Sequence, residues 1–568
     1  MTPRLSGRRR GPSRTWSRVR GIALFLILAY AGLFGWTGRL VGQAETLFRS
    51  GRLEQAHLAL LRAEFWQVRH ARVQDALAVV SLARGLLEEG QRHLEAARWG
   101  PLHPAAFGED YVLTRFLREG RFEPARLYAL ERSRVSSNPR LSFYLGAAET
   151  ALNRLDQAER HLDAARADPA FARNAERLLS LVAKRRSSGR AEFIFDRHAV
   201  PLAAVDLGTG RPALLVADVE GIVDGPDGPR VQPHERAGRI DLTLDLAIQR
   251  AAVVALGRQK GGLVVLDVET GGLLAAASQP RVDPVDGRPP ALAKAYEPGS
   301  ILKMITLVAA LRTGVDLKAV FPMECPGSIR LDRRTFRDWM RHKRVATVEE
   351  AVAVSCNIAF ARLGDLVGEN ALDVELKRYG FAPAAVMAAE RRTDFGFRVG
   401  RLLPEDPTRP HFSLARRAEG LDSVEITPIH AAMLAAGLAR GGVAPVPHMV
   451  ERRTNILGEV YQEHTAASPE IDMLSPGQVA LIRRSMVASV SSPRGTARRA
   501  AIKGLHLAMK TGTSGSNPPG HDALVVGFAP SENPRIAWGL IAEAAGKAEW
   551  EGAHITRRFL EMIATRLK

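Results

Sequence analysis

The sequence predicts a multidomain protein with four parts: a transmembrane helix, an all-α repeat region, a small β-rich connector, and an α+β domain built on a central, largely antiparallel sheet. Three observations predict it. An apolar run follows a basic tail, a helical pattern recurs at a regular interval, and the C-terminal part combines strand pairs with helices. A chain of 568 residues is long enough for several domains. The predicted boundaries are 1–20 (tail), 21–42 (transmembrane helix), 43–185 (repeats), 191–236 (connector) and 237–568 (α+β domain).

The N-terminus carries the pattern of a membrane anchor. The first twenty residues hold seven arginines and no acidic residue, and the almost unbroken apolar run Gly21–Trp36 follows. Extended to Gly42, the run reaches about twenty residues, enough to span a bilayer. The positive-inside rule leaves the tail in the cytoplasm and the rest of the chain outside. A cleaved signal peptide, with small residues Gly42 and Ala44 at the cleavage site, is the alternative, but the nearby charge of Arg39 disfavours cleavage.

The net charge of +18 does not predict nucleic-acid binding. Seven of these charges lie in the N-terminal tail, the rest are spread along the chain, and no RNA- or DNA-binding signature accompanies them. A basic exterior that faces anionic lipid or cell-envelope polymer fits better. The two cysteines, Cys325 and Cys356, form neither a metal-spaced pair nor a disulfide framework. A disulfide between them is the less favoured alternative to two free thiols.

A repeated pattern organises residues 43–185. Gly51–Ala56, Gly120–Ala125 and Asn153–Ala158 share one motif, and Gly85–Gly90 occupies the slot between the first two. The intervals are close to the tetratricopeptide period of about thirty-four residues. A small residue at the sixth position would let the two helices of a hairpin pack closely. The segment therefore resembles about four tetratricopeptide-like repeats, and an irregular helical bundle is the alternative.

Between the repeats and the α+β domain, the polar segment Lys184–Arg190 is predicted to be a linker. Residues 191–236 alternate short β-type apolar pairs with Gly, Pro and Asp. Their aspartates, Asp218, Asp224 and Asp227, lack the spacing and terminal Glu of an EF-hand, so turns are the better interpretation.

The C-terminal domain is predicted from alternating helix and strand signals. A Glu-Thr-Gly-Gly turn separates two β-type runs, and three further strands and an amphipathic helix lie near the end of the chain. This combination predicts an α+β domain. The expected elements are a helix at 242–256, a hairpin at 262–278, strands at 505–512, 523–528 and 535–543, and a helix at 554–568.

The first chemical motif is Ser300-Ile-Leu-Lys303. Pro298 and Gly299 precede an apolar stretch, so Ser300 is expected at a helix N-terminus, where free amides favour developing negative charge. Lys303 lies one turn further on the same face. Because an apolar environment lowers the pKa of a lysine, Lys303 could accept the proton of the Ser300 hydroxyl.

Two further motifs follow in order. Ser355-Cys-Asn357 would place a hydroxyl and an amide in one cleft; Ser136–Asn138 and Ser531–Asn533 match the same pattern and are interpreted as turns. Lys510-Thr511-Gly512-Thr513 ends a predicted strand. There, an unpaired edge could take an extended peptide and the lysine and threonines could hold a carboxylate.

The order S-x-x-K, S-x-N, K-T-G, with intervals of roughly fifty and one hundred and fifty residues, resembles the penicillin-binding transpeptidase family. Flanking sequence segments strengthen the resemblance: LTLDLAIQ, LVVLDVETGGLLAAAS, YEPGSILK, VEITPIHAAMLAAGLARGG, GTA at 495–497, and KTGTSG followed by ALVVGFAP. Phe195-Asp-Arg-His198 is similar, more weakly, to the D-R-x-G opening of the pedestal domain in such proteins.

The resemblance implies a role for each motif residue and no metal or organic cofactor. Ser300 would attack a terminal D-Ala-D-Ala bond, and Lys303 would be its base. Ser355 would relay the proton to the leaving D-alanine, with Lys510 completing the proton network. Asn357, Thr511, Gly512 and Thr513 would bind the substrate, and the N–H groups of Ser300 and Thr513 would form the oxyanion hole. The substrates would be peptidoglycan stem peptides, and β-lactams would be covalent inhibitors.

Several alternatives share these motifs. A D,D-carboxypeptidase uses the same acyl-enzyme, and a β-lactamase or β-lactam sensor carries the same three motifs, although no E-x-x-L-N follows Asn357. A catalytically idle scaffold that works through its repeats is the alternative from another class, and the intact motifs oppose it. Glu109-Asp110 lacks the Phe and His of a glycosyltransferase motif. The repeats, free of any catalytic group, are expected to dock an envelope protein or to act as a spacer.

Overall fold

The structure is a computed structural model that describes residues 14–66, 70–97, 107–134, 138–381, 390–392, 394–465, 473–515 and 520–567. The chain divides into two compact units. The first comprises Met1–Arg190 with Thr454–Glu459, and the second comprises Ala191–Arg453 with Val460–Lys568. The predicted turn at Ser136–Asn138 lies mostly outside the described residues, because Ser136 and Ser137 are not among them. The loop at 516–519 also lies outside them.

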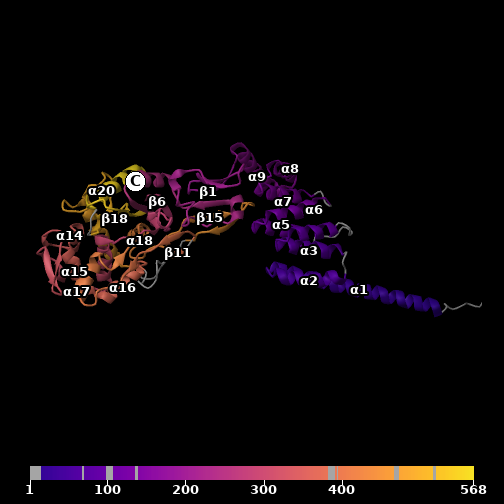
Figure 1. Cartoon of the computed structure of the whole chain (residues 1–568), viewed down its shortest axis with the longest axis horizontal. Coiled ribbons are helices and arrows are strands. Elements are labelled where there is room, and N and C mark those ends of the chain that lie inside the picture. The colour runs from indigo at the N-terminus through magenta and orange to yellow at the C-terminus, as the bar shows by residue number, and fades with distance from the viewer. Residues whose placement is uncertain are drawn as a thin grey trace, which may run out of the picture. The chain divides into compact units, whose positions relative to one another are not determined.

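The first unit is helical (Figure 1). Its helices are α1 (Arg14–Arg49), α2 (Leu53–Trp66), α3 (Ala71–Ala83), α4 (Leu87–Ala97), α5 (Glu109–Arg118), α6 (Phe122–Ser133), α7 (Pro139–Ala151), α8 (Leu155–Ala165) and α9 (Pro169–Ser188).

The four predicted repeats fall on four helical hairpins. Each motif begins at a turn with positive φ: Gly51, Gly85, Gly120 and Asn153, at +79°, +84°, +71° and +59°. These turns join α1 to α2, α3 to α4, α5 to α6 and α7 to α8. The small residues at the sixth position, Ala56, Gly90, Ala125 and Ala158, are all buried, as expected for closely packed helices. A Cβ added at Gly90 would lie 2.6 Å from Leu82, which explains why the smallest residue stands there.

The predicted linker Lys184–Arg190 is wrong, because α9 continues to Ser188 and ends at Gly189 in the left-handed conformation. Arg185 is 1% exposed and donates to the Thr150 carbonyl at 2.6 Å. Arg186 pairs with Glu159 and Asp156, each at 2.9 Å. The polar residues are therefore held by neighbouring helices, a tertiary effect that local composition does not reveal.

The N-terminal helix is also longer than predicted. Helix α1 continues without a break past residue 42 to Arg49. Its segment Ile22–Arg49 is the one described helix that is long and apolar enough to cross a membrane.

The second unit contains two main sheets. The first has six strands in the order β16-β15-β4-β1-β2-β3. Their bounds are β1 (Arg190–Phe195), β2 (Pro201–Asp206), β3 (Pro212–Leu214), β4 (Arg239–Leu242), β15 (Val450–Thr454) and β16 (Val460–Glu463). The predicted connector is therefore β-rich, but its sheet also takes in strands that lie outside residues 191–236. In the connector, Asp224 accepts a hydrogen bond from the Gly221 amide and Asp218 pairs with Arg250, consistent with structural rather than calcium-binding aspartates.

The second sheet is antiparallel with the order β17-β18-β19-β5-β6. The strands are β5 (Gly261–Asp267), β6 (Leu273–Gln279), β17 (Ala508–Ser514), β18 (Asp522–Ala529) and β19 (Ile536–Ala542). Helices α10 (Leu246–Leu256) and α20 (Glu551–Leu567) pack together in the core of one face, and α18 (Pro428–Ala439) packs against β19 and β5. The predicted antiparallel sheet with its hairpin and three late strands is confirmed.

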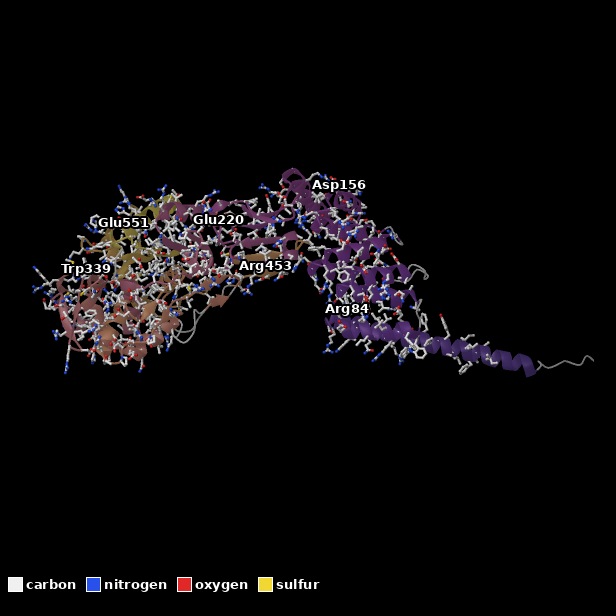
Figure 2. The ribbon with its side chains drawn as sticks, in the orientation of Figure 1. Arg84, Asp156, Glu220, Trp339, Arg453 and Glu551 are labelled. Carbon is white, nitrogen blue, oxygen red and sulfur yellow. The ribbon has the colours of Figure 1, made fainter. Side chains whose placement is uncertain are left out.

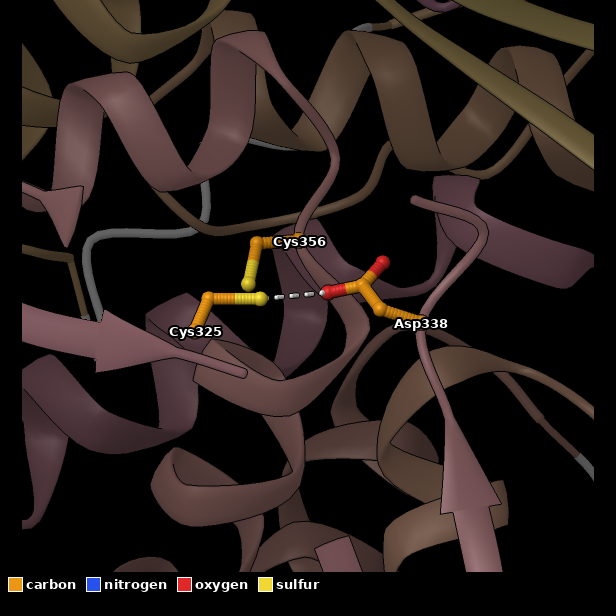
Figure 3. Close-up of side chains that lie close together, drawn as sticks. All are labelled: Cys325, Asp338 and Cys356. Atoms are coloured by element: carbon orange, nitrogen blue, oxygen red, sulfur yellow. Dashed lines mark hydrogen bonds between the residues drawn. The ribbon is translucent and has the colours of Figure 1, made fainter. Parts of the chain in front are cut away.

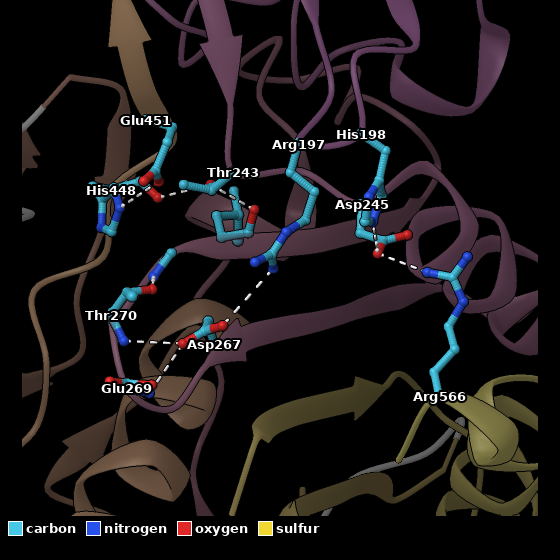
Figure 4. Close-up of polar contacts among 12 residues, drawn as sticks. Arg197, His198, Thr243, Asp245, Asp267, Glu269, Thr270, His448, Glu451 and Arg566 are labelled. Carbon is cyan, nitrogen blue, oxygen red and sulfur yellow. Dashed lines mark hydrogen bonds and ion pairs between the residues drawn. The ribbon is translucent and has the colours of Figure 1, made fainter. Parts of the chain in front are cut away.

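The predicted helix at 242–256 begins four residues later than expected, because Leu242 ends strand β4 and Asp245 caps α10. Burial alone would raise the pKa of Asp245, but hydrogen bonding from His198 and the charge of Arg566 bring it below its ordinary value. His198 and Arg566 reach the Asp245 carboxylate at 2.9 and 2.8 Å (Figure 4). Residue His198 of the predicted pedestal remnant thus helps to fix the start of this helix.

A mainly helical region shares one core cluster with side chains of β17, β18 and β19, on the face of the sheet opposite α10 and α20. Its helices are η3 (Gly299–Ile301), α12 (Lys303–Arg312), α14 (Val348–Ala353), α15 (Asn357–Val367), α16 (Glu369–Arg378), α17 (Pro410–Glu419) and α19 (Pro476–Ser491).

Candidate active site

Ser300 lies in a single 3₁₀ turn, η3, immediately before helix α12. This turn is tightly held. Gly299 has φ +52°, and a Cβ there would lie 2.7 Å from the carbonyl oxygen of Thr513. The Gly299 amide donates to the Gly420 carbonyl at 2.8 Å. The predicted position at a helix N-terminus is correct, and the fixed turn gives Ser300 a defined orientation.

Lys303 is fully buried, as its apolar neighbours predicted. Its Nζ donates to the Ser355 carbonyl at 2.8 Å and to Asn357 Oδ1 at 2.5 Å, and it lies 3.3 Å from Ser355 Oγ. Burial lowers the pKa of Lys303, and the charges of Glu419 and Asp338 oppose that shift. At a given pH, a lysine in this environment is more often neutral, and thus available to accept a proton, than one in water.

Ser355 connects the two motif lysines. Its backbone is left-handed, with φ +56°, which is unusual for a residue other than glycine. Its Oγ lies 3.0 Å from Lys510 Nζ and 3.3 Å from Lys303 Nζ. Burial, and then the charge of Lys303, hold the pKa of Lys510 well below its ordinary value. Protonating both lysines in one buried site is energetically costly, and the Ser355 hydroxyl lies within hydrogen-bond distance of both amino groups.

The K-T-G-T motif lies within β17, which is an edge strand of the five-stranded sheet. The strand runs from Ala508 to Ser514, so it begins three residues later and ends two residues later than predicted, and the whole motif lies inside it. A Cβ on Gly512 would lie 2.9 Å from the Pro298 carbonyl, so glycine here lets the Ser300 turn approach the strand. Thr511 Oγ1 donates to Thr496 Oγ1 at 2.7 Å, and Thr513 is exposed.

These elements border a cleft of about 420 Å³. Its lining includes five of the predicted residues: Ser300, Ser355, Asn357, Thr511 and Thr513. The two lysines lie fully buried behind Ser355. Sequence reasoning assigned no role to other lining residues, among them Glu297, Trp339, Arg416, Glu419, Leu421, Thr496, His521, Lys547 and Glu549. Glu297 and Thr496 lie within the segments YEPGSILK and GTA, which carry the family resemblance, whereas the others lie in segments without a recognised pattern.

Two of the unpredicted residues shape the cleft in different ways. Trp339, labelled in Figure 2, is 47% exposed. Its indole N–H donates to the carbonyl of Val354, the residue before Ser355, at 3.0 Å. Glu419 is 3% exposed. Burial raises the pKa of Glu419 to about 7, although the charges of Lys303 and Arg416 act in the opposite direction. Its carboxyl group therefore interacts electrostatically with Lys303, and the charge of this carboxyl group depends on pH near neutrality.

Cys356, the middle residue of the S-x-N motif, lies close to Cys325 and Asp338 (Figure 3). Both thiols are free and buried. Cys325 Sγ donates to Asp338 Oδ2 at 3.4 Å, and Cys356 Sγ accepts from the Ala359 amide at 3.4 Å, which caps helix α15. The ligand atoms of Cys325, Asp338 and Cys356 lie within 4.8 Å of one another, a spacing that could hold a metal ion. The spacing of the cysteines in the sequence does not indicate this grouping.

Neither thiol should react with iodoacetamide in the native protein, because both are buried and burial raises the pKa of Cys356. We expect two modified cysteines in urea and none in buffer, measured by mass spectrometry under non-reducing conditions. A Ser328→Cys variant supplies an exposed thiol as the reactive control. Rapid modification of the native wild type, or a mass two hydrogens lower that indicates a disulfide, would contradict the arrangement.

Comparison with known proteins identifies the family of the C-terminal domain. The chain matches the family described as "Penicillin binding protein transpeptidase domain" over residues 261–563. Among curated relatives, it is 28% identical over 352 residues to the peptidoglycan D,D-transpeptidase PbpA of Mycolicibacterium smegmatis, covering 55% of this chain and 68% of that protein. It is 26% identical over 326 residues to the peptidoglycan D,D-transpeptidase FtsI of Escherichia coli, covering 54% of this chain and 51% of that protein.

Solved structures share the fold. The D,D-transpeptidase domain of a peptidoglycan glycosyltransferase from Eggerthella lenta aligns with a TM-score of 0.56 at 23% identity, covering 66% of this chain and 99% of that chain. The penicillin G acyl-enzyme complex of penicillin-binding protein A from Mycobacterium tuberculosis aligns with a TM-score of 0.55 at 22% identity, covering 66% and 99%.

Proposed function

Because the chain belongs to the penicillin-binding protein transpeptidase family, we propose that it is a serine-type peptidoglycan D,D-transpeptidase that cross-links stem peptides. The observation that carries the proposal is the convergence of Lys303 and Lys510 on the hydroxyl of Ser355, in a cleft that Ser300 also lines. The names of the curated relatives support the same activity.

In the proposed acylation step, Ser300 Oγ attacks the carbonyl carbon of the terminal D-Ala-D-Ala bond while neutral Lys303 takes its proton. The N–H groups of Ser300 and Thr513 would stabilise the oxyanion. Ser355, between the two lysines, would pass a proton to the nitrogen of the departing D-alanine. An acyl-enzyme on Ser300 remains. Attack by the amine of a second stem peptide then forms the cross-link and frees Ser300.

Substrate binding is assigned to the remaining motif residues. Edge strand β17 would pair with the extended stem peptide. Thr511 and Thr513 would hold the terminal carboxylate, with Gly512 leaving room, and Asn357 would bind the peptide backbone. No metal or organic cofactor takes part in this scheme. A β-lactam would be attacked in the same way and would leave a stable acyl-enzyme, as named for the neighbour from M. tuberculosis.

The experiment that tests the activity is incubation with a stem pentapeptide and an acceptor amine, followed by product analysis. Cross-linked dimer with release of D-alanine supports the transpeptidase. Release of D-alanine without dimer would indicate a D,D-carboxypeptidase, fast turnover of penicillin would indicate a β-lactamase, and no acylation at all would leave the idle scaffold.

Helix α1 supports a proposal for the location. We assign it as a single-pass anchor in the bacterial cytoplasmic membrane, with the arginine-rich tail in the cytoplasm and the catalytic unit outside. Four helical hairpins with period and small-residue positions of the tetratricopeptide type support assigning 43–185 to that class. Stacked hairpins of this class present a groove for peptides or proteins, so we assign them the docking of an envelope partner. They contribute no group to the chemistry.

A truncated protein that begins at Arg190 should acylate with β-lactam at about the rate of the full ectodomain, because the acylating residues all lie beyond it. The measurement is the second-order rate constant for fluorescent penicillin. Ile456 is buried among the helices of the first unit, which the truncated protein lacks, so its apolar side chain would be exposed there. Ile456→Ser is therefore introduced into both proteins, which keeps the comparison matched. A short protein that is folded yet inert would show that the repeats shape the active site.

A further inference from the structure

Helix α2 leaves an apolar stripe unpacked. Its inner face buries Ala56, Ala59, Leu60 and Ala63. The outer face carries Leu58, Leu61, Phe65 and Trp66, which are 56%, 40%, 76% and 55% exposed. We call these four residues the α2 stripe. The first three follow one another at helical spacing on one face. A row of large apolar side chains of this kind is not expected on a surface that faces only water.

The stripe is graded along the helix. The first turn of α2 exposes Glu54 and Gln55, and the apolar residues lie towards its C-terminal end. Helices α1 and α2 form a hairpin with its turn at Gly51, so α2 runs back along α1. The Trp66 ring lies 6.1 Å from that of Trp36 at an interplanar angle of 89°. The apolar end of α2 therefore lies beside the end of the apolar run on α1.

Helix α1 changes character at the same level. From Ile22 to Trp36 most of its side chains are exposed, whereas from Thr37 one face is buried against the repeats through Thr37, Val41, Ala44 and Phe48. The fifteen residues Ile22–Trp36 extend about 22 Å at 1.5 Å per residue. The hydrocarbon core of a bilayer is about 30 Å thick. The apolar run is therefore about 8 Å shorter than the hydrocarbon core. The part of α1 that follows Trp36 would have to cover this distance, and the last turns of α2 lie alongside it.

We propose that the α2 stripe lies in the outer leaflet of the membrane, so that α1 and the end of α2 together complete the apolar span. Arg39 and Arg62, both exposed, can extend their long side chains to the headgroups. The lipid surface would thereby fix the first hairpin of the repeats at the membrane, instead of leaving it tethered by one helix. This inference rests on the proposed anchor.

The test uses the full-length protein in vesicles of phosphatidylethanolamine and phosphatidylglycerol, with one environment-sensitive fluorophore attached to a substituted cysteine. The labelled variants are Phe65→Cys and Leu61→Cys in the stripe, Glu54→Cys at the polar end, Ile27→Cys in the centre of the span, and Leu86→Cys as an exposed apolar control elsewhere in the repeats. Lipid-borne nitroxides and aqueous iodide are the two quenchers. We expect labels at 61 and 65 to show a ratio of lipid to iodide quenching several-fold above that at 54 and 86.

The other outcomes separate the inference from the anchor. If the label at 27 lies in lipid but the label at 65 is as accessible to iodide as the label at 54, the inference is overturned and the anchor remains supported. Iodide access at both 27 and 65 would reject the anchor itself. A label at 65 that neither quencher reaches would mean that protein covers the stripe, and would also overturn the inference. As a matched pair, Phe65→Glu should move the label at 61 towards water, whereas Leu86→Glu should not.

Discussion

Ser300→Ala should abolish covalent labelling by fluorescent penicillin and leave the fold intact. The substitution removes one oxygen atom from a half-buried side chain, in a turn held by contacts to Gly420 and Thr513 that do not involve that oxygen. Without the hydroxyl, no acyl-enzyme can form. Labelling is measured by gel fluorescence, and mass spectrometry of the wild type should locate the adduct on the peptide that contains Ser300.

Ser328→Ala is the matched control, because Ser328 is an exposed serine on strand β8 (Ser328–Leu331) of the same unit. It should label like the wild type. An adduct on any residue other than Ser300, or a Ser300→Ala protein that still labels, would reject the proposed nucleophile.

Lys303→Arg should slow acylation on the order of a hundred- to ten-thousand-fold, the range expected for loss of a general base. Arginine keeps a positive charge but does not give up its proton near neutral pH, so it cannot accept one from Ser300. The rate constant for penicillin measures the effect, and circular dichroism checks the fold, since Lys303 is fully buried. Lys318→Arg, at an exposed lysine nearby in the sequence, is the control.

The pH dependence of the wild type provides a second readout of the same base. Only neutral Lys303 can act, so the acylation rate should rise with pH and level off once the proton is lost. Because burial lowers the pKa of Lys303, the plateau should begin below the range of an ordinary lysine. A Lys303→Arg protein that acylates at close to the wild-type rate would show that another group takes the proton.

The motif residues could be proposed from the sequence because their chemistry allows few alternatives. A serine one turn before a lysine on an apolar helix can be recognised locally, and the structure has Lys303 buried as that pattern requires. Glu419 and Trp339 were missed because each reaches the cleft from a segment with no local signal, and only the fold brings them near Ser355.

The errors in the fold have the same origin. Strands β15 and β16 join β4 across about two hundred residues of chain, so no local pattern indicates their sheet. The segment at Lys184 has the composition of a linker, yet Arg185 is held by the Thr150 carbonyl of a neighbouring helix. Hydrophobic periodicity, by contrast, located the hairpin β5–β6 and the helices of the repeats, because local alternation and period determine them.

The close packing around the Ser300 turn restricts how this protein could evolve resistance to β-lactams. Gly420 has φ +89°, and a Cβ there would lie 2.1 Å from the Gly299 carbonyl oxygen. Any side chain at residue 420 or 299 would therefore displace the nucleophile that the physiological substrate also needs. Mutational routes to a lower affinity for inhibitors are left to other residues that line the cleft, such as the exposed Trp339. Selection by the drug and selection for cell-wall synthesis would then act on different residues of one cleft.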